Sequence, residues 1–201
     1  MPGSIQNLRI KLKPGRESRL LPIFQQGVYL KTRAGLPLSE VLEEAGFLLK
    51  YLEEKVQTVF LDGSAVDDLD RAIVEGGSVI ALSGAMPGLA GAILRKGSPI
   101  SALRSRTSPG MGPHRIEDTM HALRLKLFNT IANEMGPGLL HSGILVKRSD
   151  LEDFLSNRHE LLEEALLETE LDDVPISPAE LLAGKSIRST YVVLQIISSA
   201  P

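Results

Sequence analysis

Alternation of apolar and basic residues marks the start of the chain. Over residues 5–13, Leu and Ile alternate with Arg and Lys, and a period of two predicts a strand with one buried face. Residues 27–32 and 58–61 are short β-branched or aromatic runs that predict two more strands. Residues 78–82 are almost continuously apolar, which is typical of a strand covered on both faces in the middle of a sheet.

One helix is predicted between the second and third of these strands. Apolar residues recur at helical spacing over residues 38–45, with Pro37 at the start and Gly46 at the position that commonly ends a helix. The order strand, strand, helix, strand, strand is that of a β-grasp, or ubiquitin-like, domain. In such a domain a hairpin holds one helix, and a later strand enters the centre of the sheet.

The second half reads as mainly helical. Apolar residues at steps of three and four predict a helix over residues 114–135, although residues 123–127 alternate strictly, as a strand would. Capping boxes at Ser149 and Ser177 predict two further helices. Strands are expected at residues 143–146 and 190–197, the latter pairing with the former or returning to the first domain's sheet. The fold class is therefore expected to be α+β.

Composition divides the chain and limits its function. Residues 97–113 are rich in Pro, Gly and Ser, so we expect a linker between a β-grasp domain at 1–96 and a helical α+β domain at 114–201. A net charge of −3 argues against nucleic acid as the partner, and the absence of Cys excludes disulfides and thiolate metal sites. With no apolar span or secretion signal, we expect a cytoplasmic protein that does not bind membranes.

A family resemblance rests on two segments. Residues 56–82 run strand, Asp-Gly, Val, Asp-rich turn, Gly-Gly and apolar strand, and residues 38–46 form the single helix. In this order they resemble the sulfur-carrier proteins of thiamine and molybdopterin biosynthesis, and the resemblance covers residues 5–91. It implies a β-grasp fold and a protein partner such as an adenylating or biosynthetic enzyme, with no cofactor.

The Gly-rich segment after the last of these strands departs from that family. In the carriers this tail ends the chain in Gly-Gly, and the terminal carboxylate receives the sulfur. Here Gly91 is internal and has no carboxylate to activate. We therefore expect a non-enzymatic adaptor whose partner-binding arm comprises Met86, Pro87, Gly88, Leu89 and Gly91. The alternative is a carrier precursor matured by cleavage near Gly91.

A third function class rests on one spacing. His114, Glu117 and His121 would share a face of the expected helix, and imidazole and carboxylate groups are ligands for divalent metals. These residues therefore either form the metal site of a small metal-dependent enzyme or simply lie on a solvated face of the helix. No catalytic residues are assigned otherwise, so the chain is not expected to be an enzyme.

Two charged runs and the last strand leave interactions open. Acidic residues over 163–173 form either a solvated helix end or a docking surface for a basic partner. Arg95, Lys96, Arg104 and Arg106 make the expected linker basic, so it could attract that acidic run or an anionic partner. A homodimer through edge pairing of residues 190–197 also remains open.

Overall fold

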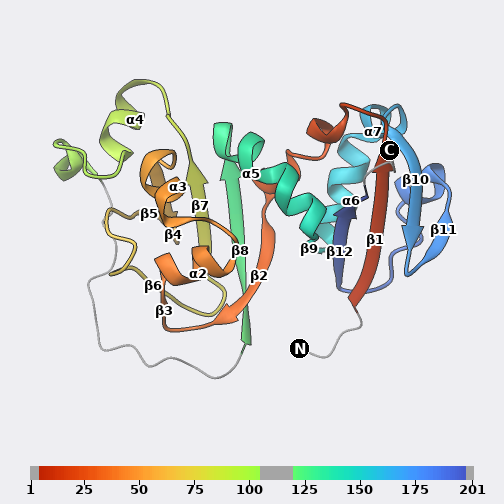
Figure 1. The fold of residues 1–201 in the computed structure, drawn as a ribbon, viewed down its shortest axis with the longest axis horizontal. Coiled ribbons are helices and arrows are strands. Elements are labelled where there is room, and N and C mark those ends of the chain that lie inside the picture. The colour runs from red at the N-terminus through yellow and green to blue at the C-terminus, as the bar shows by residue number, and fades with distance from the viewer. Residues whose placement is uncertain (1–4, 105–119, 198–201) are drawn as a thin grey trace. The chain divides into compact units, whose positions relative to one another are not determined.

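The chain forms two compact units that do not follow its order. The computed structural model describes residues 5–104 and 120–197. Unit 1 contains Met1–Tyr29 and Ala132–Pro201, and unit 2 contains Leu30–Ile131. Both units mix helices with strands (Figure 1), so the protein belongs to the mixed α+β class that the sequence predicts.

Unit 1 combines elements from both ends of the chain. Its strands are β1 (Ile5–Leu12), β9 (Ile144–Lys147), β10 (Leu166–Leu171), β11 (Val174–Ile176) and β12 (Tyr191–Ile196). Its helices are η1 (Glu17–Arg19), α1 (Ile23–Gln26), most of α5 (Asn129–Ser142), α6 (Arg148–Asn157), α7 (His159–Glu163) and α8 (Pro178–Leu182).

Unit 2 is continuous in sequence. Its strands are most of β2 (Val28–Arg33), then β3 (Leu36–Pro37), β4 (Thr58–Leu61), β5 (Ser64–Ala65), β6 (Ile73–Val74), β7 (Val79–Ser83) and β8 (Met120–Phe128). Its helices are α2 (Leu38–Glu44), α3 (Leu49–Glu54), α4 (Gly88–Leu94) and η2 (Ser101–Leu103).

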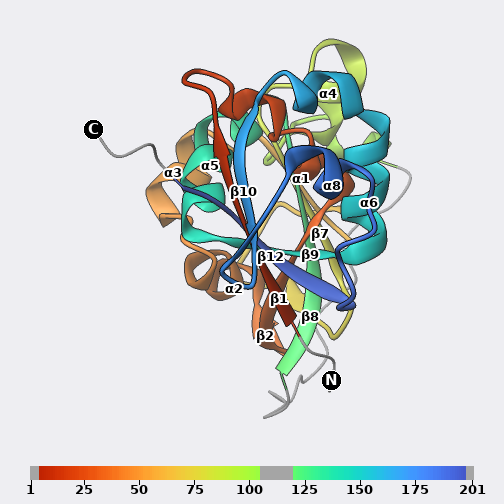
Figure 2. The ribbon, with the colours of Figure 1, turned by 90° about the vertical axis from the view of Figure 1, so that its right-hand side faces the viewer.

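The sheet of unit 1 has the order β11-β10-β1-β12-β9. Strand β1 lies between β10, to which it is antiparallel, and β12, to which it is parallel (Figure 2). Strand β12 is also antiparallel to β9. The alternating apolar residues of β1, Leu8 and Ile10, are fully buried, which is what a strand in the middle of this sheet requires.

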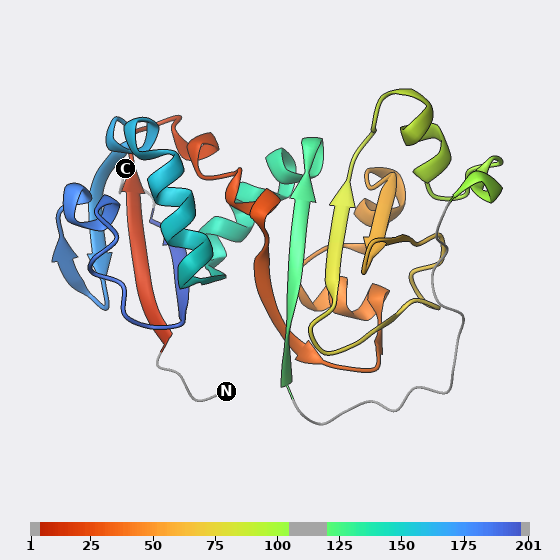
Figure 3. The same ribbon diagram turned by 180° about the vertical axis from the view of Figure 1, so that it is seen from behind.

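The sheet of unit 2 has the order β2-β8-β7-β4-β5. The two central strands, β7 and β8, are parallel, and β4 is antiparallel to β7. Figure 1 shows β2 running opposite to β8, and Figure 3 shows the face of this sheet that α2 and α3 do not cover. The buried face contains Val59, Ile80 and Leu125, and the helix α2 contributes Leu38 and Leu42 to the same core.

The structure draws attention to an internal repeat in the sequence. Residues 8–12 (LRIKL) recur as residues 123–127 (LRLKL), and residues 27–31 (GVYLK) recur as 143–147 (GILVK). Each pair of segments is followed by a helix whose buried apolar residues have the spacing i, i+3, i+4. In α2 these are Leu38, Val41 and Leu42, and in α6 they are Leu151, Phe154 and Leu155. The chain therefore repeats the order β1-β2-α2-β4-β7 as β8-β9-α6-β10-β12.

The first strand of each repeat lies in the sheet of the other repeat. Strand β1 pairs with β10 and β12, whereas β8 is a neighbour of β2 and β7. In each case the exchanged strand runs parallel to the last strand of the repeat that it joins. Each sheet is therefore complete only with a strand from the other end of the chain.

The same tight turn closes the hairpin of each sheet. Asp62 and Gly63 connect β4 to β5, Asp172 and Asp173 connect β10 to β11, and all four have positive φ. The Asp62 carboxylate accepts the Val79 backbone N–H at 2.7 Å, and that of Asp172 accepts the Asn7 backbone N–H at 2.8 Å. Each turn thus also fixes the start of the neighbouring strand.

Several predicted elements differ from the observed ones. The strand at residues 5–12 does not form a hairpin with the strand at 28–33, because its partners are β10 and β12. Residues 97–104 are folded within unit 2, whereas the rest of the expected linker, 105–113, lies outside the described residues. The compact units thus differ from the expected domains at 1–96 and 114–201.

The helix predicted over residues 114–135 is wrong. Residues 120–128 are strand β8, and the helix α5 begins only at Asn129 and continues through Pro137. The alternation at 123–127 was the correct signal, since Leu123, Leu125 and Leu127 are fully buried on one face.

Outcomes at the later elements are mixed. The strand at 190–197 is confirmed and pairs with both expected neighbours, which leaves neither edge of β12 for the dimer pairing considered above. The capping box at Ser177 is confirmed, because its Oγ accepts the Glu180 N–H at 3.1 Å. That at Ser149 is wrong, since α6 begins earlier, at Arg148. The acidic run begins at the end of α7, at Glu163, and continues into β10.

Candidate functional site

The segment that follows β7 folds back onto unit 2. We call residues 84–104, which include α4 and η2, the exit segment. It begins at a tight contact, because a Cβ at Gly84 would collide with the Thr130 Oγ1. Next to it, the Asn129 side-chain amide donates to the Ser83 Oγ at 3.0 Å. The start of the exit segment is therefore fixed at the ends of β7 and β8.

The expected partner-binding arm forms a helix rather than an extended tail. Pro87 is the N-cap residue of α4, and Gly88 has a φ of +77° at its first position. Gly91 is buried within α4, and a Cβ there would collide with the Met86 carbonyl oxygen. Leu89, in contrast, is 70% exposed. Among the arm residues, Leu89 is thus the large apolar side chain presented outward.

A buried arginine anchors the end of the exit segment. The Arg104 side chain is only 3% exposed, and its Nη1 and Nη2 donate to the Asp67 carboxylate at 2.6 and 3.1 Å. The remaining donors serve the segment itself: Nε donates to the Ile93 carbonyl at 3.0 Å and Nη2 to the Arg95 carbonyl at 2.8 Å. One side chain therefore ties α4 and η2 to the body of unit 2.

Asp67 completes this anchor from the turn that follows β5. Besides Arg104, its carboxylate accepts the Gly97 backbone N–H at 2.8 Å. The hydrogen bonds from Arg104 are the main reason that the pKa of Asp67 lies below its ordinary value, with burial opposing them. The charged pair needs no further partner, so we assign it to holding the segment in place.

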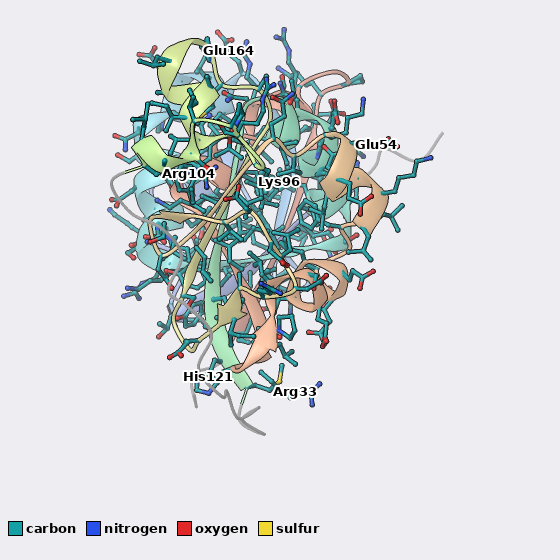
Figure 4. All side chains as sticks on the ribbon, turned by 90° about the vertical axis from the view of Figure 1, so that its left-hand side faces the viewer. Arg33, Glu54, Lys96, Arg104, His121 and Glu164 are labelled. Atoms are coloured by element: carbon teal, nitrogen blue, oxygen red, sulfur yellow. The ribbon has the colours of Figure 1, made fainter. Side chains whose placement is uncertain are left out.

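Lys96 makes a second attachment. Its Nζ donates to the Leu52 carbonyl at 2.6 Å, next to the end of α3, and its backbone N–H donates to the Gln57 carbonyl at 2.8 Å. Burial lowers the pKa of Lys96 because it disfavours the charged form. Figure 4 shows Lys96 and Arg104 at the end of unit 2 where α4 lies, and Arg33 and His121 at the opposite end.

These attachments change the meaning of the basic run. Of the basic residues expected to attract an anion, Arg104 is buried in an ion pair and Lys96 is partly buried, while Arg106 lies outside the described residues. Arg95 remains exposed. The run therefore serves largely to attach the exit segment, and we do not assign it to an anionic partner.

The expected metal ligands are not assembled in the described part of the chain. His114 and Glu117 lie outside it, and His121 is on strand β8 with its ring against Gly76. A search of the described residues finds no group of three His, Cys, Asp or Glu side chains placed to bind a metal. The helical face on which that ligand set was based is absent at His121.

Sequence reasoning missed the Arg104–Asp67 pair. Arg104 lies in a run whose Pro and Gly content indicated a linker, and Asp67 lies in an acidic turn 37 residues away. No local pattern relates two residues at that separation.

Comparisons with protein-family models, with curated proteins and with solved structures returned no match. No helix in the described residues has both the length and the apolar character needed to cross a membrane.

Proposed function

We propose that this chain is a non-enzymatic binding protein that contacts a protein partner through its exit segment. The observation that supports the proposal is a pair of exposed leucines on an anchored support. Leu89 on α4 and Leu103 on η2 are 70% and 67% exposed, whereas the Arg104 side chain next to Leu103 is almost fully buried.

Anchoring matters because binding is weakened by the entropy of ordering a flexible segment. Helix α4 packs against η2, and Arg104 donates to the carbonyls of Ile93 in the last turn of α4 and of Arg95 just after it. The leucines are thus held in place before any partner arrives. Large exposed apolar side chains on a fixed support are a common feature of protein interfaces.

The sheet of unit 2 supports the β-grasp part of the proposal. Strands β8 and β2 are neighbours that run in opposite directions, α2 packs on one face, and β7 lies parallel to β8 in the sheet centre (Figure 1). These relationships support our proposal of a β-grasp sheet in which the strand of residues 120–128 takes the place expected for residues 5–12. On this proposal, the resemblance to sulfur carriers would apply to a permuted order of strands.

The conformation at Gly91 weighs against the carrier-precursor alternative. Proteases act on extended chain, and Gly91 is buried in a helix that would first have to open. Cleavage near Gly91 would also place Arg104 and its ion-pair partner Asp67 on different fragments. We therefore favour a role for the uncleaved chain.

Site-specific photo-crosslinking tests the proposal. A photoreactive amino acid is placed at Leu89 or at Leu103, and the full chain is expressed in its native cells. The matched control position is Val174, which is 61% exposed on β11 in unit 1. We expect one dominant protein adduct from both leucine positions and not from Val174, and a lower yield when Arg104→Met releases the segment.

Two outcomes would overturn the proposal. The first is an adduct pattern that is the same from Val174 as from Leu89. The second is the intact mass of the purified protein: a fragment ending near Gly91, instead of the 21.8 kDa chain, would establish the carrier precursor.

A further inference from the structure

The sheet of unit 2 contains basic residues and no acidic ones. Strands β2, β4, β5, β7 and β8 together include Lys31, Arg33, Arg124 and Lys126, and none of these strands contains Asp or Glu. This is unexpected in a chain with an overall charge of −3. The strands of this sheet therefore carry a net positive charge.

Alternation places all four of these cations on the face away from the core, and Arg124 already has an interaction of its own. Thr32 on β2 and Leu125 on β8 are buried, so Lys31, Arg33 and Lys126 point to the other side. Lys126 lies opposite Ala81 of β7, which in turn lies opposite Phe60 of β4. We call the surface formed by these five outward residues the open face: Lys31, Arg33, Phe60, Ala81 and Lys126.

The open face is partly solvent-exposed, and no acidic side chain among the described residues pairs with its three cations. Lys31 and Arg33 are exposed, and Lys126, Ala81 and Phe60 are partly exposed. Within the part of the chain that the structure describes, Lys31, Arg33 and Lys126 make no side-chain hydrogen bond or ion pair. The surface is basic, with the apolar residues Phe60 and Ala81 beside Lys126.

The repeat supplies an internal comparison. Lys11 of β1 is the counterpart of Lys126 in the repeated LRIKL and LRLKL segments, and it also points away from its core. Lys11 has Glu168 of β10 opposite it, with 2.8 Å between Nζ and Oε1. Its neighbour Arg9 pairs with Glu170 at 3.8 Å and with Asp173. In unit 1, an acidic strand thus neutralises the basic strand.

We infer that the open face of unit 2 binds an extended acidic segment of a partner protein, with carboxylates at alternate positions. The segment supplies what Glu168 and Glu170 supply to Lys11 and Arg9 in unit 1. Carboxylates two residues apart on an extended chain project on the same side, so they reach neighbouring cations of the sheet while intervening residues face away. Phe60 and Ala81 provide apolar contact beside them.

A short acidic segment fits this surface better than a nucleic acid does. Polyanion binding gains most from many phosphate contacts and a broadly basic protein, and this chain is acidic overall. The open face offers three cations within one sheet, which matches a few carboxylates. The inference concerns a different surface from the exit segment and does not rest on the proposed function.

The probe is a capped octapeptide of alternating Glu and Thr, titrated into the full ¹⁵N-labelled chain at low salt. We expect amide shifts at residues 31, 33, 81 and 126, and binding that weakens with added salt as exposed charge pairs do. The double variant Lys31→Glu with Lys126→Glu should bind about tenfold more weakly. The matched control is Lys50→Glu with Lys55→Glu on and next to α3, which should bind like the wild type.

Three results would overturn the inference. Equal weakening in the control variant would mean that only overall charge matters. Amide shifts confined to the exit segment would place the peptide on the other surface. Tighter binding of a single-stranded oligonucleotide than of the peptide, lost in the Lys31 and Lys126 variant, would identify the open face as a nucleic-acid surface instead.

Discussion

Arg104 and Asp67 form a two-pronged ion pair in which the guanidinium is almost fully buried, with nitrogen-to-oxygen distances of 2.6 and 3.1 Å. The two residues connect the exit segment to the turn after β5. Because Arg104 also donates to the Ile93 and Arg95 carbonyls, its removal would leave three acceptor groups without these bonds.

Replacing Arg104 should loosen the exit segment before it affects the sheet. We expect Arg104→Met to lower the free energy of unfolding by about 2 kcal/mol, since lost hydrogen bonds are partly offset by water at the half-exposed Asp67. Hydrogen exchange should accelerate over residues 88–103 and stay slow in β7. Arg95→Met, which alters an exposed side chain of the same segment, should change stability by no more than about 0.5 kcal/mol.

Acid should weaken the same anchor. The pKa of Asp67 is below its ordinary value of 3.8 in the folded protein, mainly because of the Arg104 hydrogen bonds. Its contribution to stability is therefore present above that value and is lost as the pH falls through the folded pKa. Urea unfolding at several pH values between about 5 and about 2.5 should show a shallower loss for Asp67→Asn than for the wild type. Parallel pH profiles would show that this pair does not contribute to acid sensitivity.

The strands were predictable where apolar periodicity was local. The strands predicted at residues 5–13, 58–61 and 78–82 are observed at 5–12, 58–61 and 79–83, because each one alternates or is largely apolar over its own length. Residues 120–128 were misjudged because apolar residues at steps of three and four coexist with strict alternation. The alternating set, which is the one that the core of unit 2 buries, decided the outcome.

Pairing between distant segments could not be predicted in this way. Periodicity shows that one face of residues 5–12 is buried, but it does not say which strand lies beside it. The register between Leu8 and Leu194 is set by contacts that form only in the folded chain. The same limit applies to Arg104 and Asp67. The recurrence of LRIKL as LRLKL was visible in the sequence, and it would have marked residues 123–127 as a strand.

Substitution by alanine at two glycines of α5 should change the stability of unit 1 in opposite directions. A Cβ at Gly136 would lie 2.7 Å from the Leu21 Cδ2 and 3.0 Å from the Phe24 Cε2, whereas a Cβ at Gly138 would meet nothing within 4 Å. Gly136→Ala should therefore destabilise unit 1 by about 1 to 3 kcal/mol through overpacking. Gly138→Ala should stabilise it by about 0.5 to 1 kcal/mol, because alanine favours helix. Thermal unfolding of both variants checks the pair, and a loss in both would mean that this helix does not pack as described.

Fragments of the chain distinguish the observed units from domains that follow sequence order. Strand β8 contributes Leu123, Leu125 and Leu127, each fully buried, to the core of unit 2. A fragment of residues 27–131 retains β8, so we expect it to unfold cooperatively on heating and in urea. A fragment of residues 1–96 lacks β8 and leaves β1 without β10 and β12. Losing even one fully buried leucine lowers the free energy of unfolding by about 2 to 5 kcal/mol. The loss of all three leucines would therefore exceed the stability of most domains of this size.

The decisive comparison is circular dichroism with proton NMR on the two fragments under the same conditions. For the fragment 27–131 we expect dispersed amide proton signals and a sharp thermal unfolding transition. For the fragment 1–96 we expect poorly dispersed amide signals and no cooperative transition. Mixing 1–96 with a fragment of residues 114–201 should restore the dispersed spectrum, because that fragment returns β8 to unit 2 and β10 and β12 to β1. A cooperative transition in 1–96 alone would show that its β1 and β2 can pair as a hairpin, and the exchange of first strands between the repeats would then not be required for folding.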